Sequence, residues 1–298
     1  MKRGVSLIVL AAGRGSRFGG LKQFIPVGPH GEKLLEYTLY DALRAGFSQV
    51  VFIIRKRISQ ESHGVFQDLA KRIPIALVHQ EIDVLPAGSW RIAGREKPWG
   101  TGHALWVARE VVQEPFGVVN ADDFYGREAI TTLAEYLQNP GTAPGALVTY
   151  PVEKTLSRFG AVSRGTCHVQ NGYLAGIAER EKVEAVNGEI SYQGSSGRIE
   201  IPKGTPVSMN LWGGTPVILD RAEACFKAFL KENAQRKNAE FYLSTIYNRA
   251  IGEAGIKIKA LHADSEWFGL TYAEDIDCVK QRIADLIQAG IYPAHLWT

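Results

Sequence analysis

Strand-like and helix-like segments alternate along the first half of this 298-residue chain, and that order predicts an α/β fold. Short apolar runs that fit buried strands occur at 5–10, 49–54, 74–79 and 116–120. Helical segments are expected between them, at 32–45, 58–72 and 102–112. Strands joined through helices pair in parallel by right-handed crossovers, so we expect a mixed, mostly parallel sheet with helices on both faces.

Beyond about residue 150 the chain becomes rich in short strand-like pieces. Asn171 and Gly172 separate two of them and are a strong hairpin signal. The segment 184–203 is polar and rich in glycine, which predicts an exposed excursion. Further strands are expected at 207–213 and 257–263, and further helices at 221–237, 241–253 and 273–289.

Composition limits the classes of function. The net charge of +3 is small and no block of like charges occurs, which argues against nucleic acid as a partner. Cys167, Cys225 and Cys278 lack metal-ligand spacing and fit reduced thiols. No stretch has the length of a membrane span or the pattern of a signal peptide. We therefore expect a cytoplasmic protein that binds no membrane, and the sequence leaves homo-oligomer formation open.

A glycine-rich, basic loop follows the first strand. It contains Gly13, Gly15, Gly19 and Gly20 together with Arg14, Arg17 and Lys22. Glycine allows backbone N–H groups to approach an anion closely, and the cations add full charges. This chemistry predicts a phosphate cradle at the carboxyl end of the first strand. The plain alternative is a tight turn with solvated basic side chains.

Two well-known phosphate loops do not fit this stretch. The dinucleotide fingerprint needs a third glycine where Phe18 stands and an acid near Lys33. The P-loop needs a lysine directly after its second glycine, and Leu21 occupies that place after Gly20. The loop therefore matches neither of these two fingerprints.

Two adjacent acids follow the apolar run 116–120. Like charges side by side are unfavourable, and a divalent cation would give Asp122 and Asp123 a reason to be neighbours. Mg²⁺ is usually held by one or two carboxylates plus substrate phosphates. We assign Asp122 to the metal, while Asp123 fits either the site or the cap of a helix that starts near Arg127.

The segment from Leu10 to Arg17 resembles the LAAG-x-G-x-R signature of the sugar-phosphate nucleotidylyltransferases, the NDP-sugar pyrophosphorylase type. Lys22 matches the later lysine of that signature, although Leu21 stands where proline is usual. The ending Lys22-Gln23-Phe24 is closer to cytidylyltransferases that act on alcohol phosphates. The resemblance implies a Rossmann-like fold of the nucleotide-diphospho-sugar transferase type with a β-rich acceptor part.

The resemblance also implies roles for individual residues. The catalytic cations would be Arg17 and Lys22, and the metal ligand Asp122. The nucleotide would be bound by Leu10, Ala11, Ala12, Gly13, Arg14, Gly15, Gln80, Gly100 and Thr101, and the acceptor by Gly160, Glu179 and Asn210. Taken alone, Thr101 also fits an ordinary helix N-cap, and Glu179 fits a surface acid.

One family feature does not transfer. The family has a second metal ligand, commonly Asp or Asn, near the end of the chain, where Gly269 or Thr271 falls. Asp264 and Glu266 are the nearest acids that could substitute for it.

These features together predict a single domain, 1–298, with a nucleotide-binding half, 1–150, and an acceptor-binding half, 151–298. The expected reaction is Mg²⁺-dependent transfer from an NTP to a sugar 1-phosphate, giving an NDP-sugar and pyrophosphate. The acceptor phosphate is already an anion, so charge neutralisation and orientation supply the catalysis and no general base is needed. A cytidylyltransferase for a non-sugar alcohol phosphate, a glycosyltransferase and a non-catalytic nucleotide-sugar-binding regulator are the alternatives.

Overall fold

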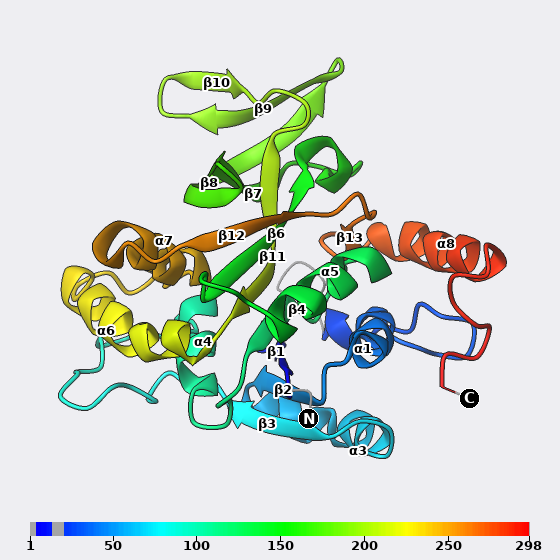
Figure 1. Cartoon of the computed structure of the whole chain (residues 1–298), viewed down its shortest axis with the longest axis horizontal. Helices are drawn as coiled ribbons and strands as arrows, with labels where there is room; N and C mark the ends of the chain where they lie inside the picture. The colour runs from blue at the N-terminus through cyan, green and yellow to red at the C-terminus, as the bar shows by residue number, and fades with distance from the viewer. Residues whose placement is uncertain (1–3, 14–20, 298) are drawn as a thin grey trace.

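The computed structural model describes residues 4–13 and 21–297. Within these residues, eleven strands form one twisted sheet that runs through the centre of the molecule (Figure 1). Four neighbouring strands at one end are parallel, in the order β4-β1-β2-β3. Their bounds are β1 Ser6–Leu10, β2 Gln49–Ile54, β3 Ile75–His79 and β4 Phe116–Asn120.

The second half of the chain extends this sheet with antiparallel strands. β11 (Pro206–Gly214) lies antiparallel between β4 and β6 (Gly145–Pro151), and β12 (Ile258–His262) pairs in parallel with β6. β7 (Val162–Gln170) and β8 (Tyr173–Val186) form a long hairpin. The sheet is therefore mixed, as expected.

Backbone geometry explains the turn of this hairpin. Asn171 and Gly172 both have positive φ, 52° and 76°, which the two-residue hairpin turn requires. The predicted excursion is a second hairpin, β9 (Glu189–Gly194) and β10 (Gly197–Glu200), which projects from the body of the molecule (Figure 1).

Helices cover both faces of the central sheet because alternate strand residues point to opposite sides. Leu7 and Val9 of β1 pack with α1, α3 and α5, whereas Ile8 packs with α4, α6 and α7. The helices on the first face are α1 Leu34–Ala45, α3 His63–Ala70 and α5 Arg127–Gln138. Those on the second are α4 Thr101–Ala108, α6 Pro216–Glu232 and α7 Leu243–Ala254. No helix in the described part of the chain is long and apolar enough to cross a bilayer.

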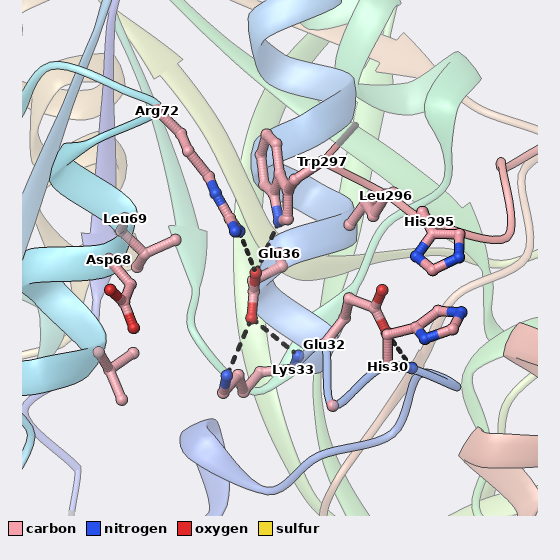
Figure 2. Close-up of a pocket in the computed structure, with 12 residues that line it drawn as sticks. His30, Glu32, Lys33, Glu36, Asp68, Leu69, Arg72, His295, Leu296 and Trp297 are labelled. Carbon is pink, nitrogen blue, oxygen red and sulfur yellow. Dashed lines mark hydrogen bonds and ion pairs between the residues drawn. The ribbon is translucent and has the colours of Figure 1, made fainter.

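A third apolar cluster joins the two ends of the chain. It contains α8 (Asp275–Gln288), the outer side of α1 and the small sheet of β5 (Asp123–Phe124) and β13 (Phe268–Gly269). The C-terminal segment lies on α1, where Trp297 Nε1 donates to buried Glu36 at 2.6 Å (Figure 2). Arg72 of the chain after α3 lies 3.7 Å from the same carboxylate, so Glu36 ties three segments together.

One predicted helix is wrong in detail. The segment 58–72 is not a single helix but α2 (Lys56–Glu61) followed by α3, with a break at Ser62. Ser62 has φ −113° and ψ 20°, outside the α-helical region. The apolar pattern of the sequence did not indicate this break, because the two helices bury Ile58, Phe66 and Leu69 in the same apolar cluster.

Candidate active site

The candidate site begins at the carboxyl ends of two neighbouring parallel strands. β1 and β4 pair in register from Ser6 and Phe116 to Leu10 and Asn120, so the segments after them emerge side by side. Ala121 N donates to Leu10 O at 3.2 Å and continues this pairing. Ligands of parallel sheets bind at such ends. Two motifs that lie far apart in sequence are therefore brought to one place.

Lys22 and Asp122 form an ion pair at this edge. Lys22 Nζ also donates to Leu270 O at 2.8 Å, and the two side chains are only 22% and 24% exposed. Lys22 begins a 3₁₀ turn, Lys22–Phe24, in which Gln23 Nε2 donates to Ala11 O at 3.3 Å. The lysine expected to bind phosphate thus contacts the carboxylate expected to bind the metal.

Asp123 is buried beside this pair and does not cap the next helix. The N-cap position of α5 is Gly126, so the capping interpretation is wrong. Asn120 Nδ2 donates to Asp123 Oδ2 at 2.8 Å, and Tyr125 OH donates to it at 3.3 Å. Burial and the neighbouring charge of Asp122 raise the pKa of Asp123.

The donor set near Asp122 fits Mg²⁺ held together with substrate phosphates. Across the described residues, no cluster of three or more His, Cys, Asp or Glu side chains could hold a metal by itself. A ligand side chain at position 269 would require the Asp123 carboxylate to move, because a Cβ there would lie 2.4 Å from Asp123 Oδ1. One carboxylate with water and phosphate oxygens is a usual Mg²⁺ environment.

The two acids considered as substitutes are engaged elsewhere. Asp264 lies on the surface, where its carboxylate is 3.5 Å from Lys154 Nζ and 3.3 Å from His262 Nε2. Glu266 lies 2.9 Å from Arg282 Nη1. Neither residue lines the cavity described below.

The predicted nucleobase residues form a compact group at the start of α4. Gln80 Nε2 donates to Gly100 O at 2.8 Å across the long connection 81–99. Gly100, not Thr101, is the N-cap of α4, and Thr101 is the first helical residue. The hydroxyl of Thr101 is used instead by another helix, because it accepts a hydrogen bond of 2.9 Å from Leu243 N at the start of α7. The N-cap prediction for Thr101 is therefore wrong.

A cavity of about 260 Å³ lies between these residues and the β-rich part of the chain. Its walls carry hydroxyl, amide, carboxyl and aromatic groups. The lining residues with side chains of interest are Thr101, Asn120, Asp123, Ser163, Arg164, Glu179, Ser208, Asn210, Tyr242, Ser244, Trp267 and Thr271. Both halves of the chain contribute. Three residues predicted from sequence, Thr101, Glu179 and Asn210, are thus brought to one cavity.

Asn210 reaches this cavity through a distortion of β11. The pairing of β11 with β6 shifts between Ser208 and Trp212, as in a β-bulge, and Asn210 has φ 62°. A non-glycine residue in this conformation costs energy and is often found at functional sites. Asn210 Oδ1 accepts a hydrogen bond of 3.4 Å from Trp212 Nε1, which helps to fix its orientation.

Glu179 lies on β8 and accepts a hydrogen bond of 3.2 Å from Ser244 Oγ of α7. Burial raises the pKa of its carboxyl, and the Ser244 hydroxyl opposes that shift. Glu179 is an exposed residue, as the surface alternative expects, and it also lines the cavity. Gly160 does not line the cavity; a Cβ there would lie 2.8 Å from Tyr272 OH.

Arg164 is a buried cation in the cavity wall. Its guanidinium lies 4.8 Å from the ring centre of Trp267 and donates from Nη1 to Ser163 O at 2.7 Å. Burial lowers its pKa to about 10. No sequence motif marked Arg164 or Ser244, because they come from separate segments that only the folded chain joins. Trp267 and Thr271 lie in the segment where the second metal ligand was expected, and both line the cavity.

The remaining predicted residues fall into two groups. Leu10, Ala11, Ala12 and Gly13 form the end of β1 and the chain that follows it, with both alanines buried. Arg14, Gly15 and Arg17 lie outside the described residues. Their assigned roles stay predictions.

The comparisons with known proteins find a similar sequence in part of the chain and a similar fold over most of it. Residues 7–108 match the model of the MobA-like NTP transferase domain. No curated protein sequence matches the chain.

Two solved structures share the fold. One is the inositol-1-phosphate CTP transferase from T. maritima, and the other is described as a glucose-1-phosphate thymidylyltransferase from Bacillus anthracis, in complex with sucrose. Each is 14% identical, covers 95% of this chain and 96% of its own, and has a TM-score of 0.64. The expected fold class and the resemblance to nucleotidyltransferases are confirmed.

Proposed function

We propose that this protein joins an NTP to a sugar 1-phosphate in the presence of Mg²⁺, releasing pyrophosphate and an NDP-sugar for nucleotide-sugar biosynthesis. The contact between Lys22 and Asp122 at the ends of β1 and β4 is the observation that carries the proposal. It joins a cation suited to phosphate, Lys22 within the matched residues 7–108, with a carboxylate suited to a metal.

The chemistry requires neutralisation of negative charge more than proton transfer. An acceptor phosphate attacks the α-phosphorus, its new P–O bond forms, and the bond to pyrophosphate breaks. Mg²⁺ bound at Asp122 would offset charge on the phosphates. Lys22 would exchange its bond with Asp122 for the phosphates, and Arg17 would add a second cation. Correct positioning can contribute about 7–11 kcal/mol.

The two halves of the chain are proposed to bind different substrates. We assign the nucleotide to the half 1–150 and the acceptor to the half 151–298, within one domain. Gln80, Gly100 and Thr101 would read the base, next to the cavity. Glu179 would accept hydrogen bonds from acceptor hydroxyls, and the Asn210 amide would both accept and donate them. Both residues line the cavity of about 260 Å³. Gly160 would act indirectly, by allowing the close approach of Tyr272.

A second acceptor class deserves the same test. The CTP transferase whose fold is similar is named for inositol 1-phosphate, an alcohol phosphate, and the Lys22-Gln23-Phe24 ending points the same way. A hydroxyl-rich cavity suits either a sugar phosphate or a cyclic polyol phosphate.

The test is pyrophosphate release with Mg²⁺, for ATP, GTP, CTP, UTP and dTTP, each against sugar 1-phosphates and alcohol phosphates including inositol 1-phosphate. One productive pair identifies the base and acceptor together. Nucleotide binding without release from any pair would contradict the proposal and favour a non-catalytic regulator. Omission of Mg²⁺ from the productive pair is the control for the metal.

A further inference from the structure

The start of α7 connects the proposed nucleobase loop to the proposed acceptor carboxylate. On the nucleotide side, Phe241 N donates to Trp99 O at 2.6 Å and Gly102 N donates to Phe241 O at 2.8 Å. Leu243 N adds the bond of 2.9 Å to Thr101 Oγ1. Three hydrogen bonds therefore hold residues 241–243 against residues 99–102 at the start of α4.

The fit between these two segments is close. A Cβ on Gly100 would lie 2.7 Å from Phe241 O, and a Cβ on Gly102 would lie 2.8 Å from the Phe241 ring. Such separations are shorter than side chains tolerate, so only glycine allows the backbones to approach this far. A displacement of one segment would consequently displace the other.

The next residue of α7 faces the acceptor side. Ser244 is 7% exposed, lines the cavity and donates to Glu179 Oε1 at 3.2 Å. One turn later, Asn248 receives a bond of 3.0 Å from Ile177 N and donates one of 2.9 Å to Ile177 O. Asn248 contacts the backbone of Ile177 and Ser244 contacts the side chain of Glu179, so α7 is held to β8 at two points.

We infer that Ser244 is a positioning residue, which sets the Glu179 carboxylate at a defined place relative to the nucleotide loop through the short path Thr101, Leu243, Ser244. This inference rests on the proposed function and adds a residue to it. Ser244 does not contact the reacting phosphates; it acts through Glu179. Its hydroxyl donates to Oε1 of Glu179, and Oε2 would accept from an acceptor hydroxyl.

The surroundings of Glu179 make its ionisation sensitive to this bond. The groups that face it are Cys167 on β7 and Tyr242 at the start of α7, while Asp123 and Arg164 lie in the wall of the same cavity. Burial disfavours the carboxylate, and Ser244 favours it. Loss of the hydroxyl should therefore raise the pKa of Glu179 further and move the acid limb of acceptor use to higher pH.

The experiment uses the full chain and the productive substrate pair. Ser244→Ala is expected to raise KM for the acceptor about tenfold, since hydrogen bonds to charged groups have this size. KM for the NTP should change less than twofold. The acid limb of kcat/KM for the acceptor should move to higher pH. Ser244→Thr keeps the hydroxyl, so both KM values and the acid limb should stay close to those of the wild type. Ser62→Ala, equally buried but between α2 and α3, is the control.

A double variant separates positioning from general packing. In a Glu179→Gln background, Ser244→Ala should have little further effect on acceptor KM. Full additivity, or an unchanged acceptor KM and pH profile in Ser244→Ala, would overturn the positioning role. A wild-type protein that releases no pyrophosphate from any pair would overturn the proposed function itself, so the two failures are distinguishable.

Discussion

Lys22 and Asp122 are in direct contact, although one follows β1 and the other follows β4. The contact exists because β1 and β4 are parallel neighbours in register. We predict that Lys22→Ala and Asp122→Asn each lower kcat by about 100-fold or more, the usual effect of removing one group that stabilises transition-state charge. Pyrophosphate release under saturating substrates measures this.

Folding should survive both changes. The two side chains are only about one-quarter exposed, so removing one partner leaves a partly buried charge, and the free energy of unfolding should fall by more than the roughly 0–1 kcal/mol of a surface pair. Lys154→Ala is the matched control, because Lys154 also pairs with an aspartate, Asp264, but on the surface. Full activity in Lys22→Ala and Asp122→Asn would refute the assigned roles, and lost activity in Lys154→Ala would revive Asp264 as a site residue.

Gly100→Ala should destabilise the protein and weaken nucleotide binding. Gly100 has φ 108°, and a Cβ would lie 2.7 Å from the backbone of Phe241. We expect the free energy of unfolding to fall by about 3 kcal/mol, since φ 108° with ψ −176° is a region that is essentially limited to glycine, costing about 1–3 kcal/mol for other residues, and the clash adds to this cost. Urea unfolding measures the loss.

Gly88→Ala separates the two contributions to this loss. Gly88 also has positive φ, 75°, but its Cβ would meet nothing within 4 Å. The free energy of unfolding of Gly88→Ala should fall by only about 1–2 kcal/mol, and this variant should keep the affinity for nucleotide. Equal losses at the two glycines would show that the contact with Phe241 is not tight.

Sequence predicted the features that depend on neighbouring residues. The four parallel strands, the Asn171-Gly172 hairpin and the position of Lys22 after β1 all follow from local periodicity, turn chemistry or a compact motif. The helix expected to end at residue 45 does end there, because the next residue, Gly46, adopts the left-handed conformation that often ends helices. Such signals lie within a few residues of the structure they specify.

Features that depend on distant partners escaped prediction. Thr101 looks like an N-cap, but its hydroxyl serves Leu243, which comes from another helix. Ser244 looks like an ordinary helical serine until β8 brings Glu179 to it. The insertion of β11 between β4 and β6 is likewise decided by tertiary packing, which no local pattern encodes. The roles of these side chains are therefore properties of the folded chain.

Asn210→Gly should separate stability from acceptor binding. Glycine adopts φ 62° without strain but adds unfolded-state entropy, so the free energy of unfolding should change by less than about 1 kcal/mol. KM for the acceptor should rise about tenfold, because the side-chain amide is lost from the cavity. Asn171→Gly, in an exposed turn with φ 52°, is the control and should leave KM unchanged. An unaltered acceptor KM in Asn210→Gly would exclude Asn210 from the acceptor site.

His103 should make the protein sensitive to acid. The side chain is fully buried, and its Nε2 must carry the proton that it donates to Val84 O at 2.9 Å. Among the described residues Nδ1 has no hydrogen-bond partner. Burial lowers the pKa of His103 to about 4, and the charges of Arg95 and Arg109 add to this shift.

The direction of the pH effect follows from these pKa values. The unfolded chain takes up a proton near pH 6.5, whereas the folded chain resists protonation until about pH 4. Above about pH 6.5 His103 is neutral in both states and costs no stability. As the pH falls from 6.5 toward 4 only the unfolded chain takes up the proton, so the free energy of unfolding falls by up to about 1.4 kcal/mol per pH unit. Urea unfolding at pH 7 and pH 4.5 should show a smaller loss of stability in His103→Gln than in the wild type. His63→Gln, an exposed site on α3, should follow the wild type. Identical losses in the wild type and His103→Gln would mean that other groups set the acid sensitivity.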